Sequence, residues 1–537
     1  MEDTVIRGSS RVKGIIVAPT YYLRRPIWAL AASAALLLAG CNPSSESGGD
    51  KGGGGDTGGP FIVARTGDID LVDPARATAF QTLQTLDLVY ETLIETADDG
   101  ELEPALATEW EVSEDGKTVT LTLREGVKFH DGADFTAADA KASLDRVLDP
   151  ETGSVVASNL MNVTDVSADD DTTLVISLKQ PDAALLNVLS QVGTSIIDED
   201  AIKAKTVERE PNGTGPFRWG SWDQGQKVTL KANKDYWGDA AKLETVELRV
   251  IPDESSILSG MKAGSFNLGV VSDPSVADQA NPDDLEVLSQ PTLSYHVLQL
   301  NGRKGPLKKL EARQAIACAL DRQQVVDTAY FGQGEVTGPI TSPAYDYDEF
   351  EGLPCEPGDL DAARDLLTKA GYPDGFTLNT IVMVGEYATA TNIAQSVQGQ
   401  LKEIGVELKL QQQQTSVYVD NWLEAKYDAA VALNGGSTDP YLMYGRYFTE
   451  TASLKKPAGL DDPKLGELLQ QGNATTDEGE RQEIFKQLQQ ELLRLSPWVW
   501  LQHNQSYYLV GKNVDGFKAL TTESLEYLTK ASRGDSG

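Results

Sequence analysis

A short apolar run near the start of the chain, residues 27–38, sets the strongest limit on how the remaining residues can fold. A bilayer span needs roughly 20 consecutive apolar residues, so this run is too short to cross one. It follows Arg24 and Arg25 and ends in small residues, which is the layout of a secretory signal peptide. No later stretch of the sequence is apolar enough to span a membrane. We therefore expect the residues after the run to fold in water outside the cytoplasm.

The residue that ends this segment is a cysteine, and its context predicts a lipid anchor. Leu38-Ala39-Gly40-Cys41 resembles the bacterial lipobox, which implies removal of residues 1–40 as a lipoprotein signal peptide and diacylation of Cys41. The alternative is an ordinary signal peptide in which the cysteine stands by chance. Residues 41–59 are mostly Gly, Ser, Asp, Glu and Lys and have little to bury, so they predict a flexible tether. The predicted location is the extracytoplasmic face of the cell membrane.

The composition beyond the tether is that of a globular protein. The chain has 537 residues, of which 40% are hydrophobic and 24% are charged, and this length suggests two or three domains. The formal net charge is −35, and residues 1–40 carry five basic and two acidic side chains, so the exported part has a charge near −38. Such a charge argues against binding to nucleic acid or to anionic lipid surfaces.

Cysteine and histidine are too scarce to indicate metal or nucleophilic chemistry. Cys318 and Cys355 remain as a pair in an oxidising compartment, which favours a disulfide over two buried free thiols. The three histidines lie far apart in the sequence, and the HExxH, CxxC and Gly-x-Ser-x-Gly motifs are absent. We therefore expect neither a metal site nor a cofactor.

The pattern of residues 109–148 predicts a β-hairpin followed by a helix. Val119, Leu121 and Leu123 alternate with threonines, as in a half-buried strand, and an Asp-Gly pair supplies the turn before it. Thr136 and Asp139 have the spacing of a capping box, so we expect a helix to begin there.

At these residues the sequence resembles the bacterial extracellular solute-binding proteins of family five, the peptide/nickel class. The motifs that carry the resemblance are Trp110-Glu-Val-Ser-Glu-Asp-Gly-Lys117, Leu123-Arg-Glu-Gly-Val-Lys-Phe-His-Asp-Gly132, Phe135-Thr-Ala-Ala-Asp139, Asn212-Gly-Thr-Gly-Pro-Phe217, Asn233-Lys-Asp-Tyr-Trp-Gly238 and Asp361-Ala-Ala-Arg-Asp-Leu-Leu-Thr-Lys-Ala-Gly-Tyr372. The resemblance runs almost end to end, and in this family the segment with His130 is scaffold.

The resemblance implies a fold with two mixed α/β lobes, the clamshell of type II (cluster C) periplasmic binding proteins. Lobe I would comprise residues 60–298, with an extra subdomain at about 90–210, and residues 501–537 would return to it. Lobe II would comprise residues 299–500. We expect the two crossings between lobes near residues 297–301 and 500–504.

The implied function is that of a lipid-anchored substrate-binding component of an ABC importer. It would capture a peptide or peptide-like solute between the lobes and deliver it to the permease, which works with an ATPase subunit. It would act as a monomer and make or break no bond. The alternatives are a binder of a non-peptide solute such as an oligosaccharide, a solute sensor and, least favoured, a surface glycoside hydrolase.

The resemblance also places the ligand-binding residues, and here the sequence departs from the peptide-binding members. Their aspartate for the peptide amine, three residues before an acidic-Pro pair, aligns with Gly436, since the pair here is Asp439-Pro440. A glycine cannot neutralise an ammonium group, and a buried unpaired charge is costly. Asp439 is either a substitute carboxylate or a turn residue. Further candidates for solute contact are Phe80, Tyr387, Asn434, Tyr441 and Tyr444.

Overall fold

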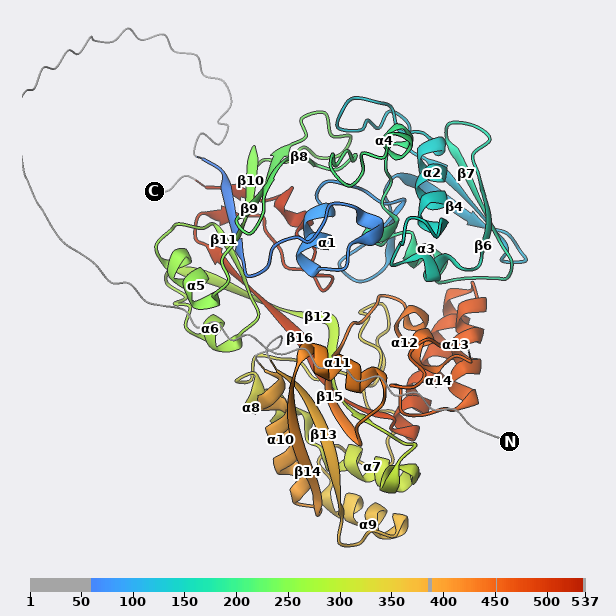
Figure 1. Ribbon diagram of the computed structural model, residues 1–537, viewed down its shortest axis with the longest axis vertical. Coiled ribbons are helices and arrows are strands. Elements are labelled where there is room, and N and C mark those ends of the chain that lie inside the picture. Colours follow the sequence, from blue (N-terminus) through green and yellow to red (C-terminus); the bar gives the residue numbers. More distant parts are fainter. Residues whose placement is uncertain (1–58, 385–388, 451, 535–537) are drawn as a thin grey trace, which may run out of the picture. The chain divides into compact units, whose positions relative to one another are not determined.

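The computed structural model describes residues 59–384, 389–450 and 452–534, which belong to one compact unit (Figure 1). Cys41 and Tyr387 lie outside the described residues, so the structure does not bear on the predictions made for them. Among the helices of the described part, none has the length and apolar character needed to cross a bilayer.

A ten-stranded sheet runs through the whole unit and sets the positions of the other elements. In spatial order its strands are β14 (Val406–Gln414), β13 (Phe376–Val384), β15 (Ala429–Asn434), β12 (Leu285–Leu300), β16 (Trp498–Gly511), β11 (Leu268–Val271), β1 (Phe61–Arg65), β10 (Thr245–Val250), β9 (Lys227–Ala232) and β8 (Phe217–Asp223). The strands at one end come from residues 376–434, and those at the other end from residues 61–271.

Two long antiparallel strands, β12 and β16, connect the two ends of this sheet. The first half of β12 pairs with β16 alone, and from Tyr295 onward β12 pairs with β15 as well. The pairing of β12 with β16 shifts register between Pro291 and Tyr295, opposite His503 and Gln505. The same pairing shifts again between His296 and Val297, opposite Gln502 and Trp500. The crossings expected at residues 297–301 and 500–504 lie next to these shifts and stay predictions.

The hydrophobic cores are separate on the two sides of this break. One core gathers side chains from residues 61–268 and 508–531, including Phe61, Leu248 and Tyr508. Another gathers side chains from residues 298–501, including Leu298 and Leu501. An aromatic core lies beside the second one and also draws only on residues 295–500. The chain therefore folds into two parts that share one sheet.

A further core belongs to a smaller sheet inserted in the first part, as the expected subdomain requires. Its strands are, in spatial order, β4 (Ala107–Val112), β5 (Thr118–Leu123), β7 (Thr173–Leu178) and β6 (Val163–Ser167). The predicted hairpin is the β4–β5 pair, and helix α2 (Ala137–Leu148) begins after Thr136. The predicted capping box is present, because Asp139 accepts the backbone N–H of Thr136 at 2.9 Å.

The remaining helices pack around the two sheets. In the first part they are α1 (Phe80–Leu86), α3 (Leu185–Val188), α4 (Glu199–Ala204), α5 (Glu254–Lys262) and α6 (Pro274–Asp278). In the second part they are α7 (Leu310–Ala319), α8 (Arg322–Ala329), α9 (Leu360–Ala370), α10 (Ala390–Lys402), α11 (Thr415–Leu423), α12 (Pro440–Phe448), α13 (Pro463–Ala474) and α14 (Glu478–Leu495). Short strands β2 (Ile94–Thr96) and β3 (Leu102–Pro104) pair with each other, as do β17 (Val514–Asp515) and β18 (Ser532–Arg533).

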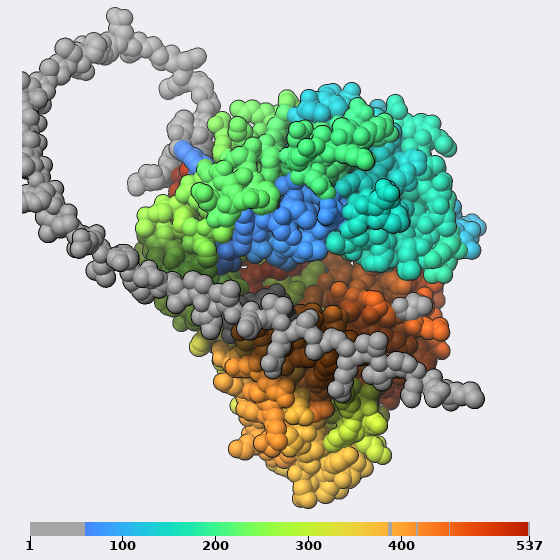
Figure 2. Space-filling model, in the orientation of Figure 1, coloured from blue at the N-terminus to red at the C-terminus, as the bar shows by residue number. Residues whose placement is uncertain are grey.

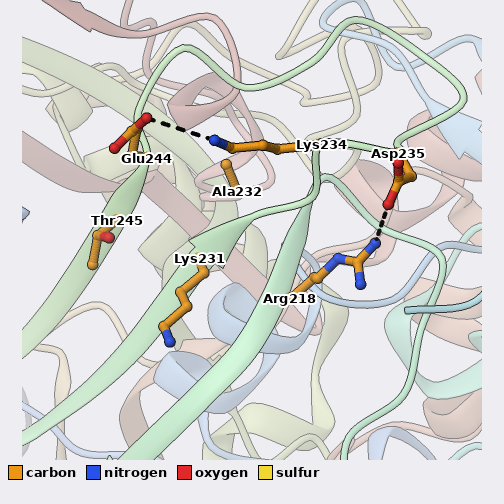
Figure 3. Close-up of a pocket in the computed structure, with 7 residues that line it drawn as sticks. All are labelled: Arg218, Lys231, Ala232, Lys234, Asp235, Glu244 and Thr245. Carbon is orange, nitrogen blue, oxygen red and sulfur yellow. Dashed lines mark hydrogen bonds and ion pairs between the residues drawn. The ribbon is translucent and has the colours of Figure 1, made fainter. Parts of the chain in front are cut away.

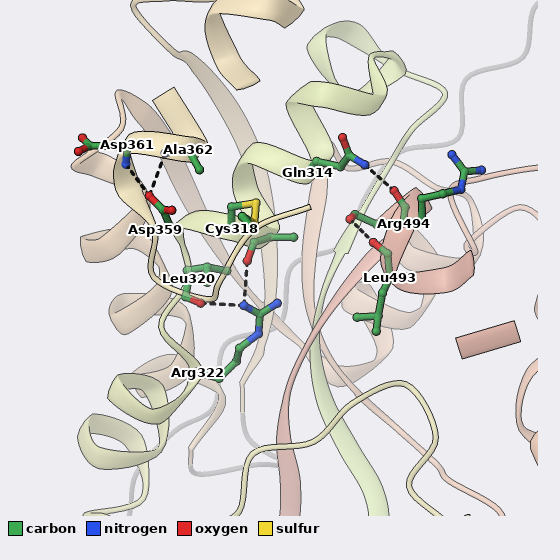
Figure 4. The surroundings of a disulfide bond; sticks show 12 residues. Gln314, Cys318, Leu320, Arg322, Asp359, Asp361, Ala362, Leu493 and Arg494 are labelled. Carbon is green, nitrogen blue, oxygen red and sulfur yellow. Dashed lines mark hydrogen bonds between the residues drawn. A yellow bond between two sulfur atoms is a disulfide. The ribbon is translucent and has the colours of Figure 1, made fainter. Parts of the chain in front are cut away.

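A disulfide fixes α7 to the chain that leads into α9. Cys318 is fully buried in α7 and is bonded to Cys355, with Cα atoms 5.8 Å apart. The next helix holds the same turn from the other side, because Arg322 donates to the carbonyls of Ala317 and Leu320 at 2.8 Å (Figure 4). The bridge therefore belongs to the core of the second part. It joins the two cysteines that the sequence predicted to pair.

Candidate functional site

Three parallel strands of the second part end at one edge of the large sheet, and this edge carries the candidate site. β13 is parallel to both β14 and β15, so their carboxyl ends point the same way. β13 leads into residues 385–388, β14 into α11, and β15 into the loop 435–439 that precedes α12. Ligands of α/β proteins bind characteristically beyond the carboxyl ends of such strands. Most of the predicted site residues, from Asn434 to Tyr444, follow β15 at this edge.

Gly436 stands in this loop because no side chain fits there. A Cβ atom on residue 436 would lie 1.8 Å from the backbone oxygen of Leu293 and 2.8 Å from Oγ1 of Thr341. Both neighbours are held, since Thr341 Oγ1 donates to that same Leu293 oxygen at 2.7 Å. The backbone at the β12 register break thus occupies the space into which a side chain at this position would extend. An aspartate could not simply replace this glycine.

Asp439 is fully buried, and its carboxylate already has partners within the protein. It caps α12, accepting the backbone N–H of Tyr441 at 2.8 Å and that of Leu442 at 3.3 Å. It also forms an ion pair with Arg481 of α14. Of the two roles expected from the sequence, substitute carboxylate or turn residue, the observed contacts are those of the helix cap. The Asp439 carboxylate in turn raises the pKa of Arg481, against the lowering effect of burial.

The aromatic candidates divide into one core residue and two that retain some exposure. Tyr444 is fully buried, donates to the backbone oxygen of Pro339 and accepts from Trp500 Nε1 at 2.9 Å. It is therefore part of the aromatic core. Tyr441 is half-buried in the first turn of α12. Phe80 begins α1 in the first part and is 40% exposed.

Asn434 is the last residue of β15, and the sheet positions it. It lies directly opposite Tyr295 of β12, next to the register break, and only 5% of its surface is exposed. Because Tyr295 follows that break at once, Asn434 stands where β12 passes from one half of the sheet to the other. A solute bound at this edge would lie beside the strands that connect the two parts.

Several polar residues near the site were not predicted from the sequence. Asn187 of α3 lies beside the loop 435–439, where its Oδ1 accepts the Thr438 hydroxyl at 2.9 Å. Arg481 reaches the same loop from α14, and Tyr345 accepts a hydrogen bond from Arg481 at 2.9 Å. Asn187 and Thr438 are 251 positions apart in the sequence. No motif marks them, and only the folded chain brings them together.

The motifs of the first part that carry the resemblance have a scaffold role, and the carboxylate of Glu91 holds two of them through hydrogen bonds. Glu91 accepts hydrogen bonds at 2.7 Å from Thr214, Tyr236 and Trp237, which belong to the Gly-Thr-Gly-Pro-Phe and Tyr-Trp motifs. Burial raises the pKa of Glu91 to about 7. His130, the other conspicuous residue, contacts the backbone oxygen of Gly215 at 2.9 Å, and burial lowers its pKa to about 4.

Among the described residues, a metal centre and a surface pocket are two other kinds of site to consider beside the loop after β15. Within residues 59–384, 389–450 and 452–534, His, Cys, Asp and Glu form no group suited to a metal ion. A surface pocket lies on β8, β9 and β10, at the end of the sheet far from β15 in strand order (Figure 3). Two ion pairs line it, Arg218 with Asp235 at 2.9 Å and Lys234 with Glu244 at 3.7 Å. This pocket belongs to the sheet edge and has no part in the candidate site.

Comparison with known families decides what this architecture is. The model of the bacterial extracellular solute-binding proteins, family 5 Middle, matches residues 101–455, about two thirds of the chain. The chain belongs to family 5 of these solute-binding proteins. The resemblance predicted from the sequence is thereby confirmed. Because members of family 5 bind solutes and are not enzymes, the membership supports a binding role over a catalytic one.

Relatives within and around family 5 cover nearly the whole chain. The glutathione-binding protein GsiB of Salmonella typhimurium is 28% identical over 478 residues, which are 85% of this chain and 91% of GsiB. The structure of AgaA from A. tumefaciens R10, in complex with agropinic acid, is 27% identical with a TM-score of 0.72, covering 89% of this chain and 99% of AgaA. CtaP of Listeria monocytogenes is 24% identical with a TM-score of 0.81, covering 89% of this chain and 100% of CtaP.

These likenesses confirm the predicted α/β fold with two lobes. The two parts that share the large sheet are the lobes, and β12 and β16 connect them. The extra four-stranded sheet belongs to the first lobe.

Proposed function

We propose that the chain is the lipid-anchored substrate-binding component of an ABC importer, which captures a peptide or peptide-like solute and delivers it to a permease. Membership in family 5 carries this proposal, and the candidate site at the carboxyl ends of β13, β14 and β15 supports it. We propose lobe I as residues 60–298 and 501–537 and lobe II as residues 299–500. Cys41 would carry the anchor, and the protein would act as a monomer.

Two lobes capture a solute when the solute binds their closed arrangement more tightly than their open one. A solute that contacts both lobes gains all its contacts only when they are together, so it stabilises the closed arrangement relative to the open one. The permease would then distinguish loaded from empty receptor by that arrangement. Side chains from both lobes are available for this, among them Phe80 from lobe I and Asn434 and Tyr441 from lobe II.

The geometry at Gly436 supports a solute that is not held by its amine at this position. The backbone of Leu293 fills the space beside residue 436, and the carboxylate of Asp439 is engaged by Arg481 and the α12 backbone. A peptide could still bind through its backbone and side chains. A non-peptide solute is the second candidate, and the same observation favours it. AgaA, at 27% identity, is a relative whose structure holds agropinic acid.

Native mass spectrometry of the protein purified from its own host tests the proposal. We expect a small solute that is held without a covalent bond and is released intact on denaturation. A solute recovered only as cleaved products would contradict the receptor function. If a peptide is recovered, its N-acetylated form should bind with an affinity within a few-fold of the free peptide. Strict dependence on a free amine would show that the inference from Gly436 is wrong.

A further inference from the structure

The two lobes touch through a set of buried polar contacts, which shares one residue, Asp439, with the solute-binding positions predicted from the sequence. In lobe I the contacts come from Asp182 to Asn187, around the start of α3, and in lobe II from the loop before α12 and the end of α13. Figure 2 shows the teal surface of the first group meeting the orange-red surface of the second at the right of the view. Asn187 and Asn473, the central side chains of the two groups, are 8% and 1% exposed.

Two backbone N–H groups of lobe I donate across this interface to a single residue of lobe II. The N–H of Ala183 donates to the backbone oxygen of Asn473 at 2.7 Å. The N–H of Ala184 donates to Oδ1 of the same asparagine at 3.1 Å. Buried backbone donors are costly to leave unpaired, so these two groups are satisfied by the opposite lobe when the lobes are together and by water when they are apart.

Asn187 forms two further hydrogen bonds across the interface, one through each polar atom of its side-chain amide. Its Oδ1 accepts the hydroxyl of Thr438 at 2.9 Å, and its Nδ2 donates to Oδ2 of Asp439 at 3.5 Å. Asp439 is held by Arg481, which also donates to the backbone oxygen of Gly472 at 2.9 Å. Arg481 therefore fixes both elements of lobe II that Asn187 and Ala183 contact, so the receiving surface is preorganised.

Apolar and close contacts continue the interface on both sides of these hydrogen bonds. Leu442 of α12 packs against the hydrophobic core of the lobe I subdomain. Gly100 of lobe I comes so close to the segment at Pro343 that a Cβ atom there would lie 3.1 Å from Pro343 Cγ. The contact between the lobes thus includes apolar packing and close backbone approach in addition to the hydrogen bonds.

We propose that these residues form an interlobe latch, which stabilises the closed arrangement independently of the solute and couples closure to the site loop. The latch consists of Ala183, Ala184 and Asn187 in lobe I and Thr438, Asp439 and Asn473 in lobe II. The coupling follows from the loop after β15, because its first residues, 435 and 436, belong to the candidate site and its last, 438 and 439, belong to the latch. This proposal rests on the proposed function only in taking closure as the step that retains a solute.

Hydrogen–deuterium exchange of the full-length protein in detergent, without added solute, tests the latch. The amides of Ala183 and Ala184 should exchange slowly in the wild type, because their partner lies in the other lobe. Thr438→Val removes one hydroxyl from lobe II and keeps the shape of the side chain. It should speed exchange of both lobe I amides about fivefold, the effect of losing one ordinary hydrogen bond. Asn187→Asp places a second carboxylate beside Asp439 and should speed exchange tenfold or more, by about the factor expected for a bond to a charged group.

Thr164→Val is the matched control, since the Thr164 hydroxyl donates to the backbone oxygen of Ser177 within the small sheet of lobe I. It should leave the amides of Ala183 and Ala184 unchanged. Amides of β5 and β7 should keep wild-type protection in all three variants, which separates opening of the latch from unfolding. Fast exchange of Ala183 and Ala184 in the wild type, or unchanged exchange in both Thr438→Val and Asn187→Asp, would overturn the proposal. The readout needs no solute, so failure to recover one would bear on the proposed function alone.

Discussion

At the scale of single residues, position 436 shows how a missing side chain can carry information. The sequence showed that an expected carboxylate is absent, but it gave no reason for the absence. The structure supplies the reason, because the oxygen of Leu293 lies where a Cβ atom would be. That oxygen belongs to a residue more than a hundred positions away, so no local pattern could have revealed the contact.

Gly436→Ala should therefore destabilise the protein by about 2–3 kcal/mol, the range for overpacking a closely packed site. The midpoint of urea unfolding would measure it. Gly399→Ala is the control, since Gly399 lies inside α10 with open space around it and alanine favours helix by about 1 kcal/mol. Equal midpoints for Gly436→Ala and the wild type would show that β12 yields easily here, and an aspartate could then be accommodated.

Glu91 makes a second prediction at this scale, because its pKa is raised in the folded protein. Burial raises it from 4.5 to about 7, so the folded state holds a proton that the unfolded state releases between these values. The stability that this proton confers is complete below pH 4.5 and is lost as the pH rises through 7. Glu91→Gln has no such proton to lose. Its free energy of unfolding, relative to that of the wild type, should therefore rise by up to about 3 kcal/mol between pH 4.5 and pH 8.

Unfolding free energies of the two proteins, measured across this pH range, would give the difference directly. Glu114→Gln is the control, since Glu114 is exposed in the β4–β5 turn. The subtraction also removes the opposite effect of His130 and His296, whose lowered pKa values favour the fold as the pH rises from 4 to 6.5. A flat difference for Glu91→Gln would mean that its three hydrogen bonds keep Glu91 ionised.

At the scale of elements, the sequence predicted the features that depend on neighbouring residues, namely hairpins and helix caps. The β4–β5 hairpin and the capping box of α2 were predicted from a few adjacent residues. The C-terminal cap of α9 at Gly371 has the positive φ, 89°, that favours glycine. Helix α14 begins at Glu478 after the cap Asp477, and the apolar stripe that it buries starts at Phe485. Its first turn is polar and lacks that stripe.

The disulfide is the element-scale feature with the sharpest test. Cys318 and Cys355 close a loop of 37 residues, and such a cross-link is expected to contribute about 3–4 kcal/mol by restricting the unfolded chain. The double variant Cys318→Ser, Cys355→Ser should lower the unfolding free energy by about that amount. The mass of protein alkylated after unfolding should rise by two alkyl groups only when a reductant is present. An identical mass with and without reductant would contradict the bridge.

At the scale of the whole molecule, the sequence predicted two lobes and two crossings between them through its resemblance to family 5, but not which strands pair. The crossings expected at residues 297–301 and 500–504 overlap the long strands β12 and β16, whose pairing shifts register between Pro291 and Tyr295 and again between His296 and Val297. Strand partners such as β11 and β16 are more than 200 residues apart. The contacts of the latch have the same origin, because their partners lie at least 251 positions apart in the sequence.

The last prediction concerns how the molecule stays at the cell surface. With a charge near −38 in the exported part, anionic lipid repels the protein, so nothing but the anchor should hold it at a membrane. One acyl chain binds weakly, whereas the diacylated cysteine implied by the lipobox would bind stably. Cys41→Ser should therefore move the protein from the membrane fraction to the soluble fraction and abolish incorporation of labelled palmitate, while Ser44→Ala should do neither. Retention of Cys41→Ser at the membrane would show that a protein partner, and not the lipid, holds this receptor in place.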